Sequence, residues 1–77
     1  NSIKIENPFT NTLKIGGLKN ATEIKIYDFS GKNVIEKKLN LDNDIISINT
    51  SFLTNGVYML NISFLDSSSK SFKIIKN

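Results

Sequence analysis

The side chains of this chain that could do chemistry are seven carboxylates and ten basic groups, with no histidine or cysteine to assist them. Without histidine the chain lacks the usual general base near neutral pH and the commonest transition-metal ligand. Without cysteine it lacks thiolate nucleophiles, thiolate metal ligands and disulfides. The acids are scattered rather than paired, at Glu6, Glu23, Asp28, Glu36, Asp42, Asp44 and Asp66. We therefore expect no catalytic residue, no metal and no cofactor, but a domain that recognises a partner or is recognised by one.

Every basic residue is a lysine, and the net charge is +3. Arginine is the preferred residue for bidentate contacts to phosphate and guanine, so its absence argues against a nucleic-acid partner. The sequence has no run of about 18 apolar residues that could cross a membrane. We expect neither nucleic-acid binding nor direct membrane insertion.

The length of 77 residues corresponds to one small domain, which buries only about 60% of its unfolded surface. The chain starts at Asn1 without an initiator Met or a leader segment. We expect residues 1–77 to be a single domain that is a piece of a longer polypeptide.

Alternation of apolar and polar residues predicts seven short β-strands and no helix beyond a single turn at Thr50–Leu53, which crosses between two layers. Strands at this spacing, with turn residues between them, are typical of an all-β sandwich. The expected strands are Ser2–Glu6, Thr12–Ile15, Thr22–Tyr27, Val34–Leu39, a segment around Ile46 and Ile48, the segment of Tyr58, Leu60, Ile62 and Phe64, and Lys70–Lys76.

Turn chemistry separates these strands. Asn7-Pro8 is a turn signal because proline cannot donate to a ladder. In the loop Asp28–Lys32, Asp28 is expected to accept backbone N–H bonds and Gly31 to supply a positive φ. The adjacent apolar residues Val34 and Ile35 indicate a bulge or an edge position in the strand that follows.

The predicted faces assign several side chains. Ile24, Ile26 and the four alternating residues from Tyr58 to Phe64 should point inward, whereas Val57 and Met59 lie on the opposite face. Tyr58 is expected to be a core aromatic residue whose hydroxyl reaches the rim. For Phe9, Phe29 and Phe52 the sequence leaves both a core role and an exposed contact open.

Two lysines of the last strand, Lys73 and Lys76, are expected to lie in solvent. A terminal strand is accessible, so a receptor could pair with its backbone and read the two lysines with acidic groups. Gly56 is expected to allow a neighbouring strand to approach closely.

Four short signatures, taken in order, give the chain a resemblance to a known family. They are Asn7-Pro8, Ile26–Lys32, Leu53–Tyr58 and Lys73–Lys76. From Asn7 to its end the chain resembles the type A C-terminal sorting domain of the type IX (Por) secretion system. The residues that carry the resemblance and would form the recognition signal are Asn7, Pro8, Asp28, Gly31, Lys32, Gly56, Tyr58, Lys73, Ile74, Ile75 and Lys76.

The resemblance implies an Ig-like seven-stranded antiparallel β-sandwich at the end of a larger secreted protein, with the cargo in cis on its N-terminal side. Its partners would be an outer-membrane β-barrel shuttle protein and a sortase-like cysteine peptidase that usually removes the domain. The cargo would pass the periplasm and the outer membrane and become secreted or attached to the cell surface. A second interpretation is an Ig-like adhesive or carbohydrate-binding spacer of a surface protein, although a chain with two tyrosines and no tryptophan offers few aromatics for glycan contacts.

Overall fold

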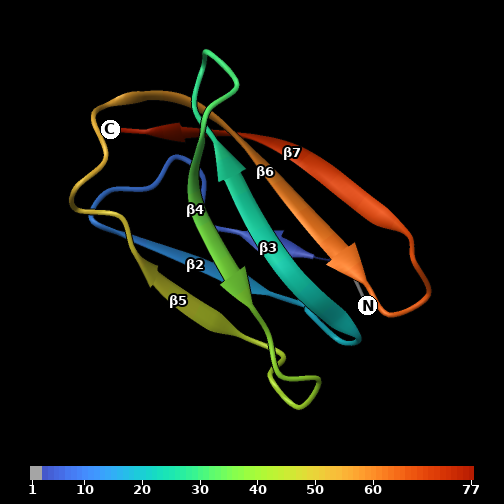
Figure 1. Cartoon of the computed structure of the whole chain (residues 1–77). Helices are drawn as coiled ribbons and strands as arrows, with labels where there is room; N and C mark the ends of the chain where they lie inside the picture. Colours follow the sequence, from blue (N-terminus) through green and yellow to red (C-terminus); the bar gives the residue numbers. More distant parts are fainter. Residues whose placement is uncertain (1–2) are drawn as a thin grey trace.

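Seven β-strands build the part of the chain that the computed structural model describes, residues 3–77, and this part contains no helix (Figure 1). Ser2, where the first strand was expected to begin, lies outside the described residues. The strands are β1 (Lys4–Ile5), β2 (Thr12–Gly16), β3 (Ala21–Tyr27), β4 (Asn33–Lys38), β5 (Ile46–Asn49), β6 (Gly56–Phe64) and β7 (Ser69–Lys76).

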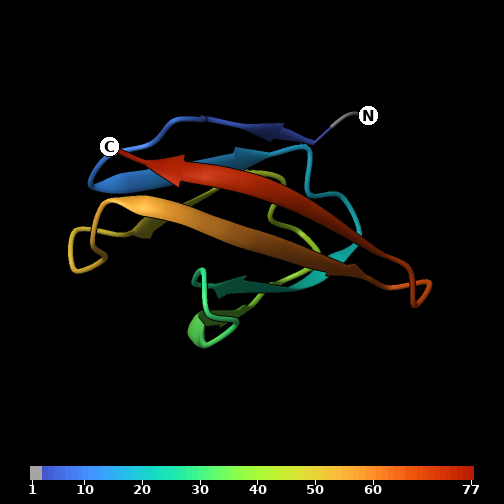
Figure 2. The same ribbon diagram turned by 90° about the horizontal axis from the view of Figure 1, so that it is seen from above.

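The strands form two antiparallel sheets that face each other. One has three strands in the order β1-β2-β5, and the other has four in the order β4-β3-β6-β7. Figure 2, turned by 90°, shows β6 and β7 running side by side along the length of the larger sheet. The predicted all-β sandwich with seven strands is confirmed.

The strand bounds differ from the prediction by a residue or two. β1 has only two residues, and β7 begins at Ser69, so the serine run is shared between the hairpin tip and the strand. In the β3–β4 ladder Ile26 lies opposite Ile35 and Tyr27 opposite Asn33, which leaves Val34 as the extra residue of a bulge. β4 is also an edge strand, so the bulge and the edge position predicted there are both confirmed.

The core lies between the sheets and follows the predicted alternation. Ile24, Ile26, Leu60 and Ile62 are fully buried, and Phe64 packs against them at the margin. Successive side chains of a strand point to opposite faces, and only one face meets the other sheet. The remaining buried apolar residues are Phe9, Leu13, Ile15, Leu18, Ala21, Ile46, Ile48, Leu53, Tyr58 and Ile74.

The three phenylalanines that the sequence left open separate clearly. Phe9 is 1% exposed and belongs to the core, whereas Phe29 is 91% exposed and Phe52 is 65% exposed. Phe52 belongs to the expected turn between the layers, in which the Leu53 N–H donates to the Thr50 carbonyl oxygen at 3.0 Å. This turn carries the chain from β5 in the smaller sheet to β6 in the larger one.

Candidate functional site

Three of the four signatures belong to the larger sheet and meet at one of its ends, and the register of this sheet explains why. Lys76 lies opposite Gly56, and Lys73 lies opposite Met59, which in turn lies opposite Tyr27. The start of β6, the end of β7 and the end of β3 therefore share one end of the sheet. Figure 1 shows the C-terminus there, beside the connection from β5 to β6.

The Asn7-Pro8 signature is bound directly to the terminal strand. The Asn7 side-chain oxygen accepts from the Ile75 N–H at 2.9 Å, and its Nδ2 donates to the Lys73 carbonyl oxygen at 3.3 Å. Phe9 continues this contact through its backbone. Its N–H donates to the Ile75 carbonyl oxygen, and its carbonyl oxygen accepts from the Asn77 N–H, both at 2.9 Å. Phe9 and Lys76 thereby form an isolated parallel bridge.

These contacts cover the free edge of β7 along its C-terminal half. The expectation that the terminal strand is accessible for backbone pairing is therefore wrong from Lys73 to Asn77. The physical reason is that an exposed strand edge is a template for association, and here the Asn7–Phe9 segment supplies the missing partner from the same chain.

The placement of Lys76 in solvent is also wrong, because its side chain is 5% exposed. Its Nζ donates to the carbonyl oxygens of Leu53 at 2.6 Å, Thr50 at 2.8 Å and Ser51 at 3.5 Å. The backbone turn between the sheets leaves these carbonyls without a strand partner, and an ammonium group has three donors to satisfy them. Lys76 thus fastens the last strand to the crossover turn.

Thr50, which the sequence did not single out as a site residue, connects the Lys76 contact to the segment that precedes β2. It is fully buried, its hydroxyl donates to the Thr10 carbonyl oxygen at 2.9 Å, and its N–H donates to the Asn11 carbonyl oxygen at 2.9 Å. Within residues 3–77 every buried side-chain nitrogen and oxygen has a hydrogen-bond partner. No signal in the sequence marks Thr50, because its partners come from a segment 40 residues away.

Tyr58 lies where the sequence placed it. The side chain is buried, and its hydroxyl donates to the Thr54 carbonyl oxygen at 2.7 Å. Its ring packs against Phe9 with centroids 6.5 Å apart and a tilt of 58°, a favourable aromatic arrangement. This contact joins the Asn7-Pro8-Phe9 segment to the β6 signature.

The Asp28–Lys32 loop satisfies its own polar groups at the tip of the β3–β4 hairpin. The Asp28 carboxylate accepts from the Ser30 hydroxyl at 2.7 Å and from the N–H groups of Ser30 and Lys32 at 2.9 Å each. The Ser30 hydroxyl bond, followed by the Lys32 N–H bond, holds the pKa of Asp28 below its usual value. Gly31 has φ +90°, so the expected turn chemistry is confirmed.

Gly56 has a different reason from the one expected. A Cβ added there would meet no atom within 4 Å, so the strand beside it makes no close approach. Its φ is +151°, a conformation that residues with a side chain rarely adopt. The requirement for glycine is therefore set by the backbone angle where β6 begins.

The remaining signature residues differ in exposure. Ile74 is fully buried, whereas Pro8, Lys32 and Lys73 are exposed and Ile75 is 39% exposed. Of these residues, only the exposed side chains can contact a partner. Buried Ile74, together with Lys76 and Tyr58, holds the strands in place.

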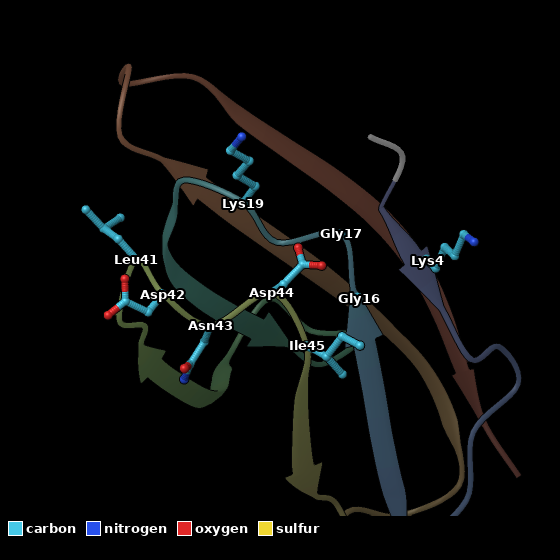
Figure 3. A pocket seen from close by; sticks show the side chains of 9 residues that line it. All are labelled: Lys4, Gly16, Gly17, Lys19, Leu41, Asp42, Asn43, Asp44 and Ile45. Atoms are coloured by element: carbon cyan, nitrogen blue, oxygen red, sulfur yellow. The ribbon is translucent and has the colours of Figure 1, made fainter.

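A hollow lies at the opposite end of the sandwich. It is an open space of about 820 Å³, with its charged residues, Lys4, Lys19, Asp42 and Asp44, among the lining. Figure 3 shows Leu41, Asp42 and Asn43 fanning out from the loop before β5, while Lys4 points away on the other side. No three acidic side chains of residues 3–77 gather as a metal site. The hollow contains none of the signature residues.

The geometry describes a folded recognition element, and no helix of residues 3–77 is long and apolar enough to span a membrane. No curated protein matches the chain. A family model described as the secretion system C-terminal sorting domain matches residues 7–77, which begin at the Asn7 that binds β7 and run to the last residue. The chain belongs to this family, the C-terminal sorting domains of type IX secretion, whose members mark secreted or cell-surface proteins for the secretion machinery.

Proposed function

We propose that this chain, residues 1–77 as one domain, directs a cargo attached on its N-terminal side from the periplasm through the outer membrane. An outer-membrane β-barrel shuttle protein would recognise the domain in its folded form. A sortase-like cysteine peptidase at the cell surface would then remove it. The domain is thus a substrate of the export machinery and has no catalytic role.

The observation that supports recognition in the folded form is the way the signature residues are bound to one another. Asn7 binds the backbone of Lys73 and Ile75, and Lys76 binds the turn that precedes β6. Residues that are far apart in the sequence form one unit only when the sandwich is complete. An unfolded chain would present none of these relationships.

The test is a reporter protein carrying the chain at its C-terminus, expressed in a bacterium that has a type IX system. We expect the reporter in the medium or at the cell surface, and in the periplasm when Phe72–Asn77 is deleted. Because that deletion removes the buried Ile74 and Lys76, Ile74→Asp serves as a second variant that unfolds the domain at full length. Export of either variant at the normal level would contradict recognition of the folded domain.

Removal by the peptidase has its own readout. Mass spectrometry of the exported reporter should find the cargo without the sandwich, and a strain that lacks the peptidase should retain it. The intact fusion in the medium of both strains would rule out cleavage but leave export standing.

A further inference from the structure

One exposed surface remains at the end where the signatures meet. It lies on the outer face of the larger sheet and consists of Tyr27, Val57, Met59, Lys73 and Ile75, which we name the outer corner. Val57 lies opposite Ile75, and Met59 lies between Tyr27 and Lys73. Val57 and Ile75 are each 39% exposed and Met59 is 43% exposed, so three apolar side chains share this patch.

The charges along the same face are distributed unevenly. Away from the outer corner, Lys25 lies opposite Glu36 and Glu23 lies opposite Lys38, so each charge faces one of opposite sign. Lys73 lies opposite Met59, with no acid across the ladder. The uncompensated positive charge of this face thus borders the apolar patch.

We propose that the outer corner is the docking surface through which the sorting domain is read. The occupant is a protein surface of the export machinery that is apolar at its centre and carries carboxylates at its rim. The inference rests on the proposed function and adds to it the surface and the chemistry of the partner. An apolar centre with a charged border is the usual composition of a protein–protein contact, and the lysine selects a partner of opposite charge.

The covered edge of β7 determines the mode of contact. From the Lys73 carbonyl to the Asn77 N–H the outward backbone groups are engaged by Asn7 and Phe9, so a partner cannot add a strand there without displacing this segment. Side chains on the sheet face remain free to make the contact. Of the two lysines in the signature, Lys73 is in reach of a partner and Lys76 is not.

The experiment uses the reporter fusion with four substitutions, two in the outer corner and two matched controls. Met59→Thr keeps a strand-forming residue but removes the apolar group, and Lys73→Glu reverses the charge. Leu65→Thr makes the same kind of change at a 60% exposed leucine at the far end, and Lys14→Glu reverses an exposed charge on β2 in the other sheet. We expect about a tenfold fall in exported reporter for each outer-corner variant, a fall typical of lost charge and packing contacts, and none for the controls.

Lys73→Arg keeps the positive charge and should be exported like the wild type. Export of Lys73→Arg beside failure of Lys73→Glu shows that the partner recognises the charge and not the lysine side chain as such. Thermal unfolding of each purified fusion, followed by the domain's far-ultraviolet circular dichroism, shows whether the sandwich is intact. Lys73→Glu decides the question if Met59→Thr lowers stability, because the Lys73 side chain is exposed and has no core contact to lose.

The outcomes separate the two proposals. If the wild-type fusion is exported and the outer-corner variants are exported equally well, the docking surface is wrong and the sorting function stands. The docking surface is also wrong if the controls lower export as much as the outer-corner variants. If the wild-type fusion stays in the cell, the sorting function fails and the docking surface with it.

Discussion

The side-chain oxygen of Asn7 accepts a hydrogen bond from the backbone N–H of Ile75 at 2.9 Å, across a separation of 68 residues. The amide nitrogen of the same side chain binds the Lys73 carbonyl oxygen. One amide group thus provides a donor and an acceptor to two residues of the terminal strand. The first signature of the sequence is in this way a structural complement of the last.

Removing the Asn7 amide should weaken this end of the domain. For Asn7→Ala we expect a loss of about 1 kcal/mol in the free energy of unfolding, because two partly solvated hydrogen bonds are lost and water replaces part of them. Chemical denaturation measures the loss. Amide hydrogen exchange at Ile75 should speed up, while exchange at Leu60 in the core should follow global unfolding alone. Unchanged exchange at Ile75 would show that the bond is not maintained in solution.

Lys76 and Lys73 should respond very differently to the same substitution. Lys76→Met keeps an apolar stem but removes the ammonium donors. The Leu53 carbonyl then loses its buried donor, whereas the Thr50 carbonyl still accepts the Leu53 N–H, so we expect a cost of about 1–3 kcal/mol in the free energy of unfolding. Lys73→Met changes an exposed side chain and should alter stability by less than about 0.5 kcal/mol.

Urea denaturation of both variants gives the comparison directly. A similar effect at the two positions would mean that the Lys76 ammonium group is solvated and does not fasten the crossover turn. Export of the Lys73→Met reporter, set beside its stability, then shows whether the exposed lysine is read by the machinery.

Three glycines offer a matched test of backbone conformation. Gly31→Ala and Gly56→Ala place a Cβ at φ +90° and +151° and should each cost about 1–2 kcal/mol, although both sites have space for the methyl group. Gly16→Ala should be neutral or stabilise by up to about 1 kcal/mol, since its Cβ would meet Ile45 Cγ1 at an ordinary 3.6 Å and the unfolded chain loses entropy. Thermal melts of the three variants rank the costs, and an equal effect at all three sites would refute the conformational reason.

The sequence predicted what depends on near neighbours. The alternation of Tyr58, Leu60 and Ile62 places one face in the core because the strand period is two. The adjacent pair Val34 and Ile35 interrupts that period, and the structure has its bulge there. The Asp28 turn could also be predicted, because all of its hydrogen bonds lie within four residues.

What the sequence did not predict depends on distant partners. Lysine is among the residues least often buried, so Lys76 was placed in solvent. Its burial follows from carbonyl groups 23 to 26 residues earlier, whose orientation is fixed only when the two sheets pack. The covered edge of β7 has the same origin, since Asn7 reaches it from the opposite end of the chain. In both cases signature residues that were expected to be recognised by a partner, Lys76 and the backbone of the terminal strand, instead stabilise the fold.

The Asp28 turn should make the free energy of unfolding depend on pH. The hydrogen bonds from Ser30 and Lys32 lower the pKa of Asp28, and the Ser68 hydroxyl does the same for Asp66 in the β6–β7 hairpin. A carboxyl group with a lower pKa in the folded state adds stability above its unfolded pKa, near 3.8, and this contribution is lost as the pH falls through the folded value. We therefore expect stability to decrease as the pH is lowered below about 4.

Asp28→Asn keeps a side-chain oxygen that can accept the same N–H bonds but removes the charge. The fall in unfolding free energy at acid pH should be shallower than in the wild type, and shallower still when Asp66→Asn is added, because the two turns are independent. Ser30→Ala removes the largest contribution and should raise the Asp28 pKa toward its usual value in a carboxyl-carbon NMR titration. An Asp28 pKa that stays low in Ser30→Ala would assign the shift to the backbone N–H groups instead. If the unfolding free energy of the wild type falls no more steeply at acid pH than that of the double variant, neither turn contributes to the pH dependence.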